Sequence, residues 1–199
     1  NKLVFLLPED SDETMIDELK TFNFKIFLSN RSKKATIKYF NLIKKIIKSE
    51  NIDILHIHGN SHTLAVELLA AKLAGCKVRI AHAHSTSCRY QTLHKLLTPI
   101  FNKSYTHGFA CGKAAGEFMY GIKPFTVINN GIATSRFAYN ENACFKIRAQ
   151  YNLGDNIVIG HVGSFSEVKN QSFLIDILIA LLKHSEKYSL MLIGEGKTQ

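Results

Sequence analysis

The 199-residue sequence lacks the features that mark several common classes of protein. No apolar run approaches the roughly 18 residues that a membrane-spanning helix needs. The first residues lack the charged start, the long apolar stretch and the small-residue cleavage site of a signal peptide. The cysteines at positions 76, 88, 111 and 144 are too widely spaced for a metal knuckle or a redox pair. We therefore expect a cytoplasmic protein with reduced thiols.

Three widespread sequence motifs are also absent. No Gly-x-Gly-x-x-Gly follows a predicted strand, which argues against a nicotinamide-dependent dehydrogenase. No Gly-x-Ser-x-Gly elbow is present, which argues against a hydrolase of the Ser–His–Asp type. The Walker pattern of P-loop proteins is missing as well. The function must therefore be argued from less specific patterns.

The sequence does contain a regular alternation of short apolar runs and helical stretches. Because 46% of its residues are hydrophobic, it can form a sizeable core. Several runs lack period-two alternation, as is typical of strands that are covered on both faces. The predicted strands span residues 3–7, 24–28, 53–58, 78–84, 108–111, 125–128, 157–162 and 190–193.

Three of the stretches between these runs have a strong helical pattern. In the first, Tyr39, Phe40, Ile43, Ile46 and Ile47 share one helical face. The second spans residues 64–74 with Gly75 as its C-cap, and the third spans residues 168–184. Alternation of strand and helix predicts an α/β fold with a mainly parallel sheet.

The organisation changes after the turn residues Asn129, Asn130 and Gly131. We predict an α/β domain over 1–135, a connector over 136–153 and a second α/β domain that begins within 154–199. The first residues already have the pattern of a strand, and the run at 190–193 lacks a following helix. We therefore expect the natural protein to continue beyond both ends of the chain.

The net charge of +9 is concentrated in the first part of the chain. Residues 1–135 carry 18 basic and 10 acidic side chains, whereas residues 136–199 carry 7 and 6. A basic helical face can rest on an anionic membrane, and the alternative is an ordinary solvated surface. Nucleic acid is not expected, because no exposed aromatics interleave with the basic residues. The basic segment contains Arg31, Lys33, Lys34, Lys38, Lys44, Lys45 and Lys48.

A turn between a buried strand and a helix is a candidate phosphate site. After the strand at 157–162, Gly163 permits close approach of a ligand to the backbone, and Lys169 adds a positive charge. A helix N-terminus near Lys169 would add unpaired N–H donors, which suit a diphosphate. The alternative is an ordinary loop with an exposed lysine. Gly194-Glu195-Gly196 follows the last predicted strand, at the edge where open α/β sheets bind ligands, so it is a second candidate binding segment. The alternative is that it is a plain glycine turn.

Histidines gather on two neighbouring predicted strands. His56 and His58 point to one face of the first strand, and His82 and His84 repeat this spacing on the next, while His62 follows the first pair. Such pairs are metal ligands in some hydrolases, so a metal-dependent hydrolase is an alternative. No complementary carboxylate ligand is evident, and a structural histidine is the default for each one. His84 nevertheless ends a strand at the edge where open sheets bind ligands.

Together these segments resemble the family-4 glycosyltransferases, especially those of bacterial capsule and exopolysaccharide synthesis. Their order and spacing extend over nearly the whole chain. The resemblance is carried by the motifs at residues 53–59, 79–85, 110–116, 127–132, 161–170 and 194–196.

The resemblance implies a GT-B architecture with two Rossmann-like domains, the first for the acceptor and the second for a nucleotide-diphosphate sugar. It implies sugar transfer with retention of configuration, no cofactor and no obligatory metal, because a basic turn stabilises the leaving diphosphate. The acceptor would be a glycan or a lipid-linked sugar at the inner membrane face. In this family's pattern His84 is the active-site histidine near the transferred sugar. The other implied sites are the donor diphosphate site (Gly163, Ser164, Lys169, Asn170), the nucleotide side (Gly194, Glu195, Gly196), the interdomain cleft (Asn130, Gly131) and the membrane contact (Lys38, Lys44, Lys45, Lys48).

Two departures from the family pattern bear on activity. Ser164 occupies the position at which the family usually has an arginine, so one of two phosphate-binding cations is absent. The family's paired-glutamate motif would follow residue 199, and its first strand and glycine-rich loop would precede residue 1. We therefore expect the chain by itself to be inactive, and a non-catalytic sugar-nucleotide or glycan binding protein is the alternative function.

Overall fold

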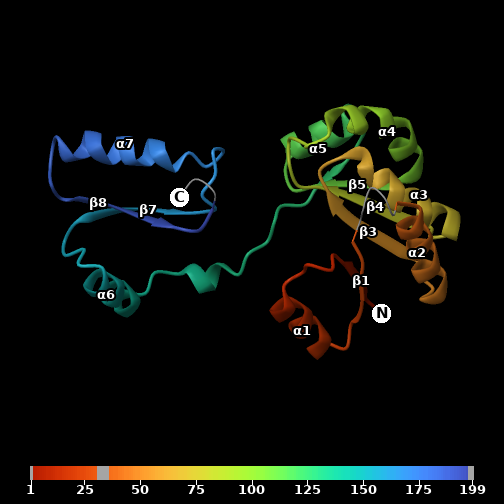
Figure 1. Ribbon diagram of the computed structural model, residues 1–199, viewed down its shortest axis with the longest axis horizontal. Coiled ribbons are helices and arrows are strands. Elements are labelled where there is room, and N and C mark those ends of the chain that lie inside the picture. Colours follow the sequence, from red (N-terminus) through yellow and green to blue (C-terminus); the bar gives the residue numbers. More distant parts are fainter. Residues whose placement is uncertain (1, 31–35, 197–199) are drawn as a thin grey trace. The chain divides into compact units, whose positions relative to one another are not determined.

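The computed structural model describes residues 2–30 and 36–196 (Figure 1). The chain divides into two compact units, Asn1–Gly131 and Ile132–Gln199. Both units consist of parallel strands connected by helices, as the sequence predicts. The segment expected as a connector, 136–153, belongs to the second unit.

The first unit contains two parallel sheets. In the larger sheet the strands are hydrogen-bonded in the order β3-β4-β5-β6, and in the smaller one β1 pairs with β2. The strands are β1 (Val4–Leu7), β2 (Lys25–Leu28), β3 (Ile54–Gly59), β4 (Val78–Ala83), β5 (His107–Ala110) and β6 (Thr126–Val127). The helices are α1 (Glu13–Thr21), α2 (Thr36–Ser49), α3 (Ala65–Ala74), α4 (Gln91–Ser104) and α5 (Lys113–Tyr120), with a 3-10 turn, η2, at His62–Leu64.

Helices α3, α4 and α5 cover one face of the larger sheet (Figure 1). Leu55, Ile57, Ala81 and Ala83 point from β3 and β4 into this core, which also contains the fully buried ring of Phe101 on α4. Because side chains alternate along a strand, the histidines of β3 and β4 lie on the opposite face. The helical layer thus leaves the histidine face of the sheet for other contacts.

The smaller sheet is joined to the rest of the unit through the end of α2. The Glu50 carboxylate is nearly buried and receives Lys2 from one side at 2.5 Å and Lys25 from the other at 2.6 Å. Hydrogen bonds from Lys2 and Lys25 lower the pKa of Glu50. Leu6 of β1 packs with Ile43 and other residues of α2 and α3.

The second unit is built around two paired strands. Strand β7 (Ile157–Val162) pairs in parallel with β8 (Tyr188–Ile193), so that Val162 lies opposite Ile193. Its helices are α6 (Glu141–Gln150) and α7 (Gln171–Leu182), preceded by a 3-10 turn, η3, at Thr134–Phe137. Helix α7 packs along β8 (Figure 1).

The eight predicted strands and three predicted helices are all present, but the start of α7 was predicted wrongly. The helix begins at Gln171, whereas the sequence pattern placed its start at residue 168. Asn170 has a left-handed backbone conformation with φ of 49°. The N–H groups of Lys169 and Asn170 both donate to the carbonyl of Ser166 in a separate turn. Lys169 therefore belongs to the loop before the helix.

Close packing of α5 on the edge strand depends on Gly116. A Cβ atom at this position would overlap the ring of Phe125, which lies just before β6. At Gly112, the N-cap of the same helix, a Cβ would meet no atom within 4 Å. The two glycines therefore differ in the space beside them, although both lie at the start of one helix.

We expect Gly116→Ala to destabilise the protein by about 1–3 kcal/mol, the usual cost of overpacking a core. Alanine in an open helical position would instead stabilise by up to about 1 kcal/mol. Gly112→Ala is the matched control and should change stability by less than about 1 kcal/mol. Urea unfolding followed by circular dichroism measures both, and equal stability of the two variants would contradict this packing.

Candidate functional site

Four histidines form a continuous cluster on the open face of β3 and β4. The parallel register places His58 directly opposite His82. Nε2 of His56 lies 3.1 Å from Nδ1 of His82, and Nδ1 of His58 lies 2.8 Å from Nε2 of His84. All four rings stack or tilt against their neighbours. The structure thus brings the two predicted histidine pairs together at one place on the sheet.

The cluster holds its central imidazole in the neutral form. Burial, with smaller contributions from the neighbouring His84, His58 and His56, lowers the pKa of His82 to about 4. Burial also lowers the pKa values of His56 and His58, with smaller contributions from nearby histidines. At neutral pH these three rings therefore carry lone pairs that can accept a proton or bind a metal.

His62, by contrast, has a structural role. Its ring is buried, and Nε2 lies 2.7 Å from the Met119 carbonyl oxygen. Nδ1 lies 2.8 Å from the Thr98 hydroxyl, and the His62 backbone N–H donates to Nδ1 of His94. These contacts link η2 to α4 and α5. Both ring nitrogens of His62 have hydrogen-bond partners, so we interpret His62 as a structural histidine.

The two candidate turns of the second unit lie side by side. The Gly163 N–H donates to the Ile193 carbonyl at 2.9 Å, and the Phe165 N–H donates to the Glu195 carbonyl at 2.9 Å. Phe165 also pairs with Gly196 as an isolated parallel bridge. The turn after β7 and the turn after β8 therefore form one backbone surface at the carboxyl edge of the strands, where α/β sheets bind ligands.

This close contact requires glycine at two positions. A Cβ at Gly194 would overlap the carbonyl oxygen of Gly163, and Gly194 also has a φ of 151°. A Cβ at Gly196 would overlap the carbonyl oxygen of Phe165. Absence of side chains here lets the two backbones meet and exposes their polar groups to a ligand.

Lys169 extends beside this surface. Its Cε lies 3.8 Å from the position a Cβ would occupy on Gly163. Asn170 follows as the N-cap of α7, and its side-chain oxygen accepts a hydrogen bond from Ser172 Oγ at 3.0 Å. The first-turn N–H groups of a helix lack intrahelical partners and carry a partial positive charge. The charged side chain of Lys169 and the N-terminus of α7 therefore lie next to each other in the chain.

Sequence reasoning missed one residue that shapes this turn. The buried Gln171 donates from Nε2 to the Ser164 carbonyl at 2.9 Å, while its Oε1 is buried without a hydrogen-bond partner. Gln171 fixes the backbone at the position where an arginine was expected. The position of the Gln171 side-chain amide directly after Asn170 is the one signal in the sequence that could have indicated this hydrogen bond.

The remaining predicted site residues belong to the first unit but not to its histidine cluster. Asn130 and Gly131 are the last two residues of the first unit, after β6. On α2 the side chains of Lys38, Lys45 and Lys48 are exposed, while Lys44 lies 5.8 Å above the ring of Phe40. Arg31, Lys33 and Lys34 lie outside the described residues. No helix among the described residues is long and apolar enough to cross a membrane.

Comparison with known proteins gives relatives for both units. The chain is 31% identical over 168 residues to the Bacillus subtilis protein named "Putative glycosyltransferase EpsF", and the match covers 78% of the chain and 44% of that protein. The chain thus spans less than half the length of this curated relative.

Solved structures share the fold. The crystal structure of Anabaena HepE in complex with UDP superposes with a TM-score of 0.72 at 18% identity, covering 99% of this chain and 62% of that chain. The complex of HepE with UDP and glucose gives a TM-score of 0.70 at 19% identity, covering 98% and 62%. The architecture is therefore GT-B-like, with Rossmann-like domains of parallel strands, as expected.

The family model described as Glycosyltransferase Family 4 matches residues 2–136. This range covers most of the chain and contains the histidine cluster. The chain belongs to Glycosyltransferase Family 4.

Proposed function

We propose that the protein containing this chain transfers a sugar from a nucleotide-diphosphate sugar to a glycan or lipid-linked acceptor in polysaccharide biosynthesis. The observation that carries this proposal is the pairing of the turn at Gly163 with the turn at Gly194, beside Lys169, in a member of this family. The Bacillus relative is named as a glycosyltransferase, and the structures of HepE hold UDP.

The paired turns supply what a diphosphate requires. Lys169 provides a full positive charge, and the N-terminus of α7 provides about half of one. When the sugar leaves, negative charge develops on the diphosphate, and donors fixed beforehand stabilise that charge without reorganising. In the proposed reaction this electrostatic contribution takes the place of an obligatory metal at the phosphates, with Gly194, Glu195 and Gly196 on the nucleotide side.

We assign His84 to the transferred sugar. It directly follows β4, at the carboxyl edge of the sheet, and His58 holds its Nε2 through a 2.8 Å contact. A ring fixed in this way can present its other nitrogen to a substrate hydroxyl. Retention of the anomeric configuration and a hexose as the transferred sugar belong to the same proposal.

Three finer statements stay predictions: a role in capsule synthesis, a cytoplasmic location, and contact with an anionic inner membrane surface. The residues predicted to make that contact are Lys38, Lys44, Lys45 and Lys48. The exposed lysines on a helix with buried Ile43, Ile46 and Ile47 support the membrane contact, because the polar face is free of the core. A cleft role for Asn130 and Gly131 likewise stays a prediction.

A binding protein without transferase activity is the second candidate function. Ser164 favours it, because the turn lacks the second cation that the family pattern leads us to expect. Incubation of the natural full-length protein with a panel of nucleotide sugars separates the two functions. Binding without transfer or hydrolysis would support the binding protein. The hydrolase interpretation of the histidines loses its support with the family assignment.

We expect Lys169→Ala to weaken binding of a nucleoside diphosphate by roughly 10- to 150-fold, which corresponds to about 1.5–3 kcal/mol for a charged hydrogen bond. Lys183→Ala is the matched control, because it removes the same charge from the other end of α7. Isothermal titration of UDP into each variant measures the affinity. Equal affinities for the two variants would refute the contact.

We expect His84→Asn to reduce turnover by roughly 10- to 100-fold while leaving nucleotide affinity unchanged, because one transition-state hydrogen bond is lost in the unit that does not hold the diphosphate. Sugar transfer by the full-length protein and titration of UDP provide the two measurements. His107→Asn on the neighbouring strand should retain full turnover. Full activity of His84→Asn would remove His84 from the reaction.

A further inference from the structure

The histidine cluster contains more hydrogen-bonding capacity than its contacts use. Two ring-to-ring contacts involve four of the eight ring nitrogens of the four histidines. Nε2 of His82 is buried and has no hydrogen-bond partner. This atom points away from the contact between His56 Nε2 and His82 Nδ1, so it takes no part in the site described below. The rings still have nitrogens that their mutual contacts do not occupy, and their geometry indicates what these could bind.

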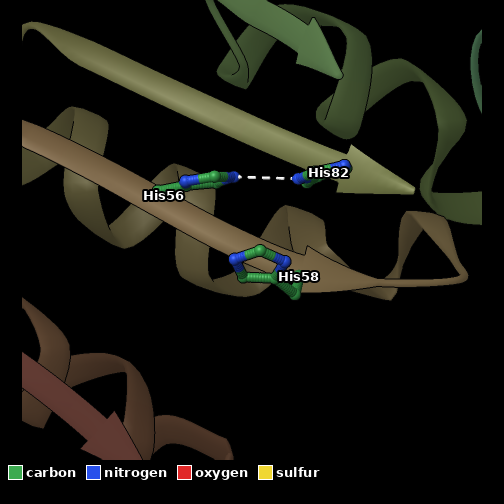
Figure 2. A group of neighbouring side chains, drawn as sticks. All are labelled: His56, His58 and His82. Carbon is green, nitrogen blue, oxygen red and sulfur yellow. Dashed lines mark hydrogen bonds between the residues drawn. The ribbon is translucent and has the colours of Figure 1, made fainter. Parts of the chain in front are cut away.

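Three of these rings are placed as metal ligands would be (Figure 2). His56, His58 and His82 each offer one nitrogen, and the three nitrogens lie within 4.8 Å of one another. Zinc binds imidazole at about 2.0–2.1 Å, which places two ligand nitrogens of a tetrahedral site about 3.3 Å apart. The 3.1 Å separation of His56 Nε2 and His82 Nδ1 already meets that requirement. The exposed His58 ring supplies the third nitrogen.

The surroundings support the same interpretation. His84 Nε2 can accept a hydrogen bond from Nδ1 of His58, which leaves Nε2 of His58 for the ion and fixes the orientation of the ring. No carboxylate belongs to the group, so magnesium and calcium, which prefer oxygen ligands, are disfavoured.

We propose that His56, His58 and His82 form a three-histidine site for one divalent zinc-like ion on the open face of β3 and β4, with one coordination position left for water or a ligand. His84 is the outer partner that orients His58. All residues of the site belong to the first unit, whereas Gly163 and Lys169 belong to the second. The site does not depend on the proposed glycosyl transfer.

We expect the chain, stripped of metal with a chelator, to bind one equivalent of Zn²⁺, measured by competition with a chromogenic chelator. Co²⁺ should give the visible absorption of a four-coordinate site. His56→Gln and His82→Gln should each weaken binding by roughly 100-fold or more, because loss of a ligand exceeds the 10- to 100-fold typical of an outer partner. His84→Gln should weaken it by roughly 10-fold.

His107→Gln is the matched control, because it removes an imidazole from the adjacent strand β5, outside the group. This variant should retain the full affinity for Zn²⁺. If the buried His82→Gln variant fails to fold by circular dichroism, the exposed His56→Gln and His58→Gln variants decide the matter. Lack of one-equivalent binding by the unaltered chain, or unchanged affinity in the folded ligand variants, overturns the site. UDP affinity, measured in parallel, tests the proposed function independently.

Discussion

The parallel register of adjacent strands determines what each unit can present to a ligand. In the first unit it sets His58 opposite His82, so that two separate His-x-His segments become one cluster. In the second unit it sets Val162 opposite Ile193, so that both strands end at the same level. The two turns that follow must then meet. A shift of one residue in either pair would move these groups to the opposite face or apart.

Contact between backbones is the feature that the two candidate regions of the second unit share. Gly194 and Gly196 bring their chain against the carbonyls of Gly163 and Phe165 at separations that no Cβ would permit. The same requirement holds Gly116 against Phe125 in the first unit, although there it serves the core. A glycine in a sequence motif therefore has two physical meanings, ligand approach or packing. The atoms beside each glycine distinguish the two.

The sequence predicted the strands well because buried parallel strands are short, continuous apolar runs. It also predicted the buried face of α2, since Ile43, Ile46 and Ile47 follow helical spacing. It failed at the start of α7, because the left-handed conformation of Asn170 interrupts a pattern that otherwise continues into the helix. The separation of β1 and β2 from the larger sheet was not predictable either, since pairing between strands leaves no mark on local periodicity.

The candidate sites were also predictable only in part, because local spacing appears in the sequence whereas contacts between distant segments do not. The spacing of His56 and His58 places them on one face, but the contacts across to His82 and His84 depend on register. The burial of His82 beside exposed neighbours is a tertiary property. Likewise, Gly163 and Lys169 were evident as a turn, whereas the hydrogen bond from Gln171 to the Ser164 carbonyl depends on where α7 begins.

The charge at the turn from Gly163 to Asn170 decides what Ser164 would mean for the diphosphate binding that we propose. A diphosphate with about two negative charges would meet one full charge from Lys169 and roughly half a charge from the N-terminus of α7. An arginine at position 164 would bring the sum above two. With Ser164 the positive charge falls short of two, and Lys169 would supply a larger share of the attraction than either cation of a matched pair. The affinity of this turn for a diphosphate should therefore fall as salt is added. The fall should be steeper than that of a site that binds only through uncharged backbone N–H groups.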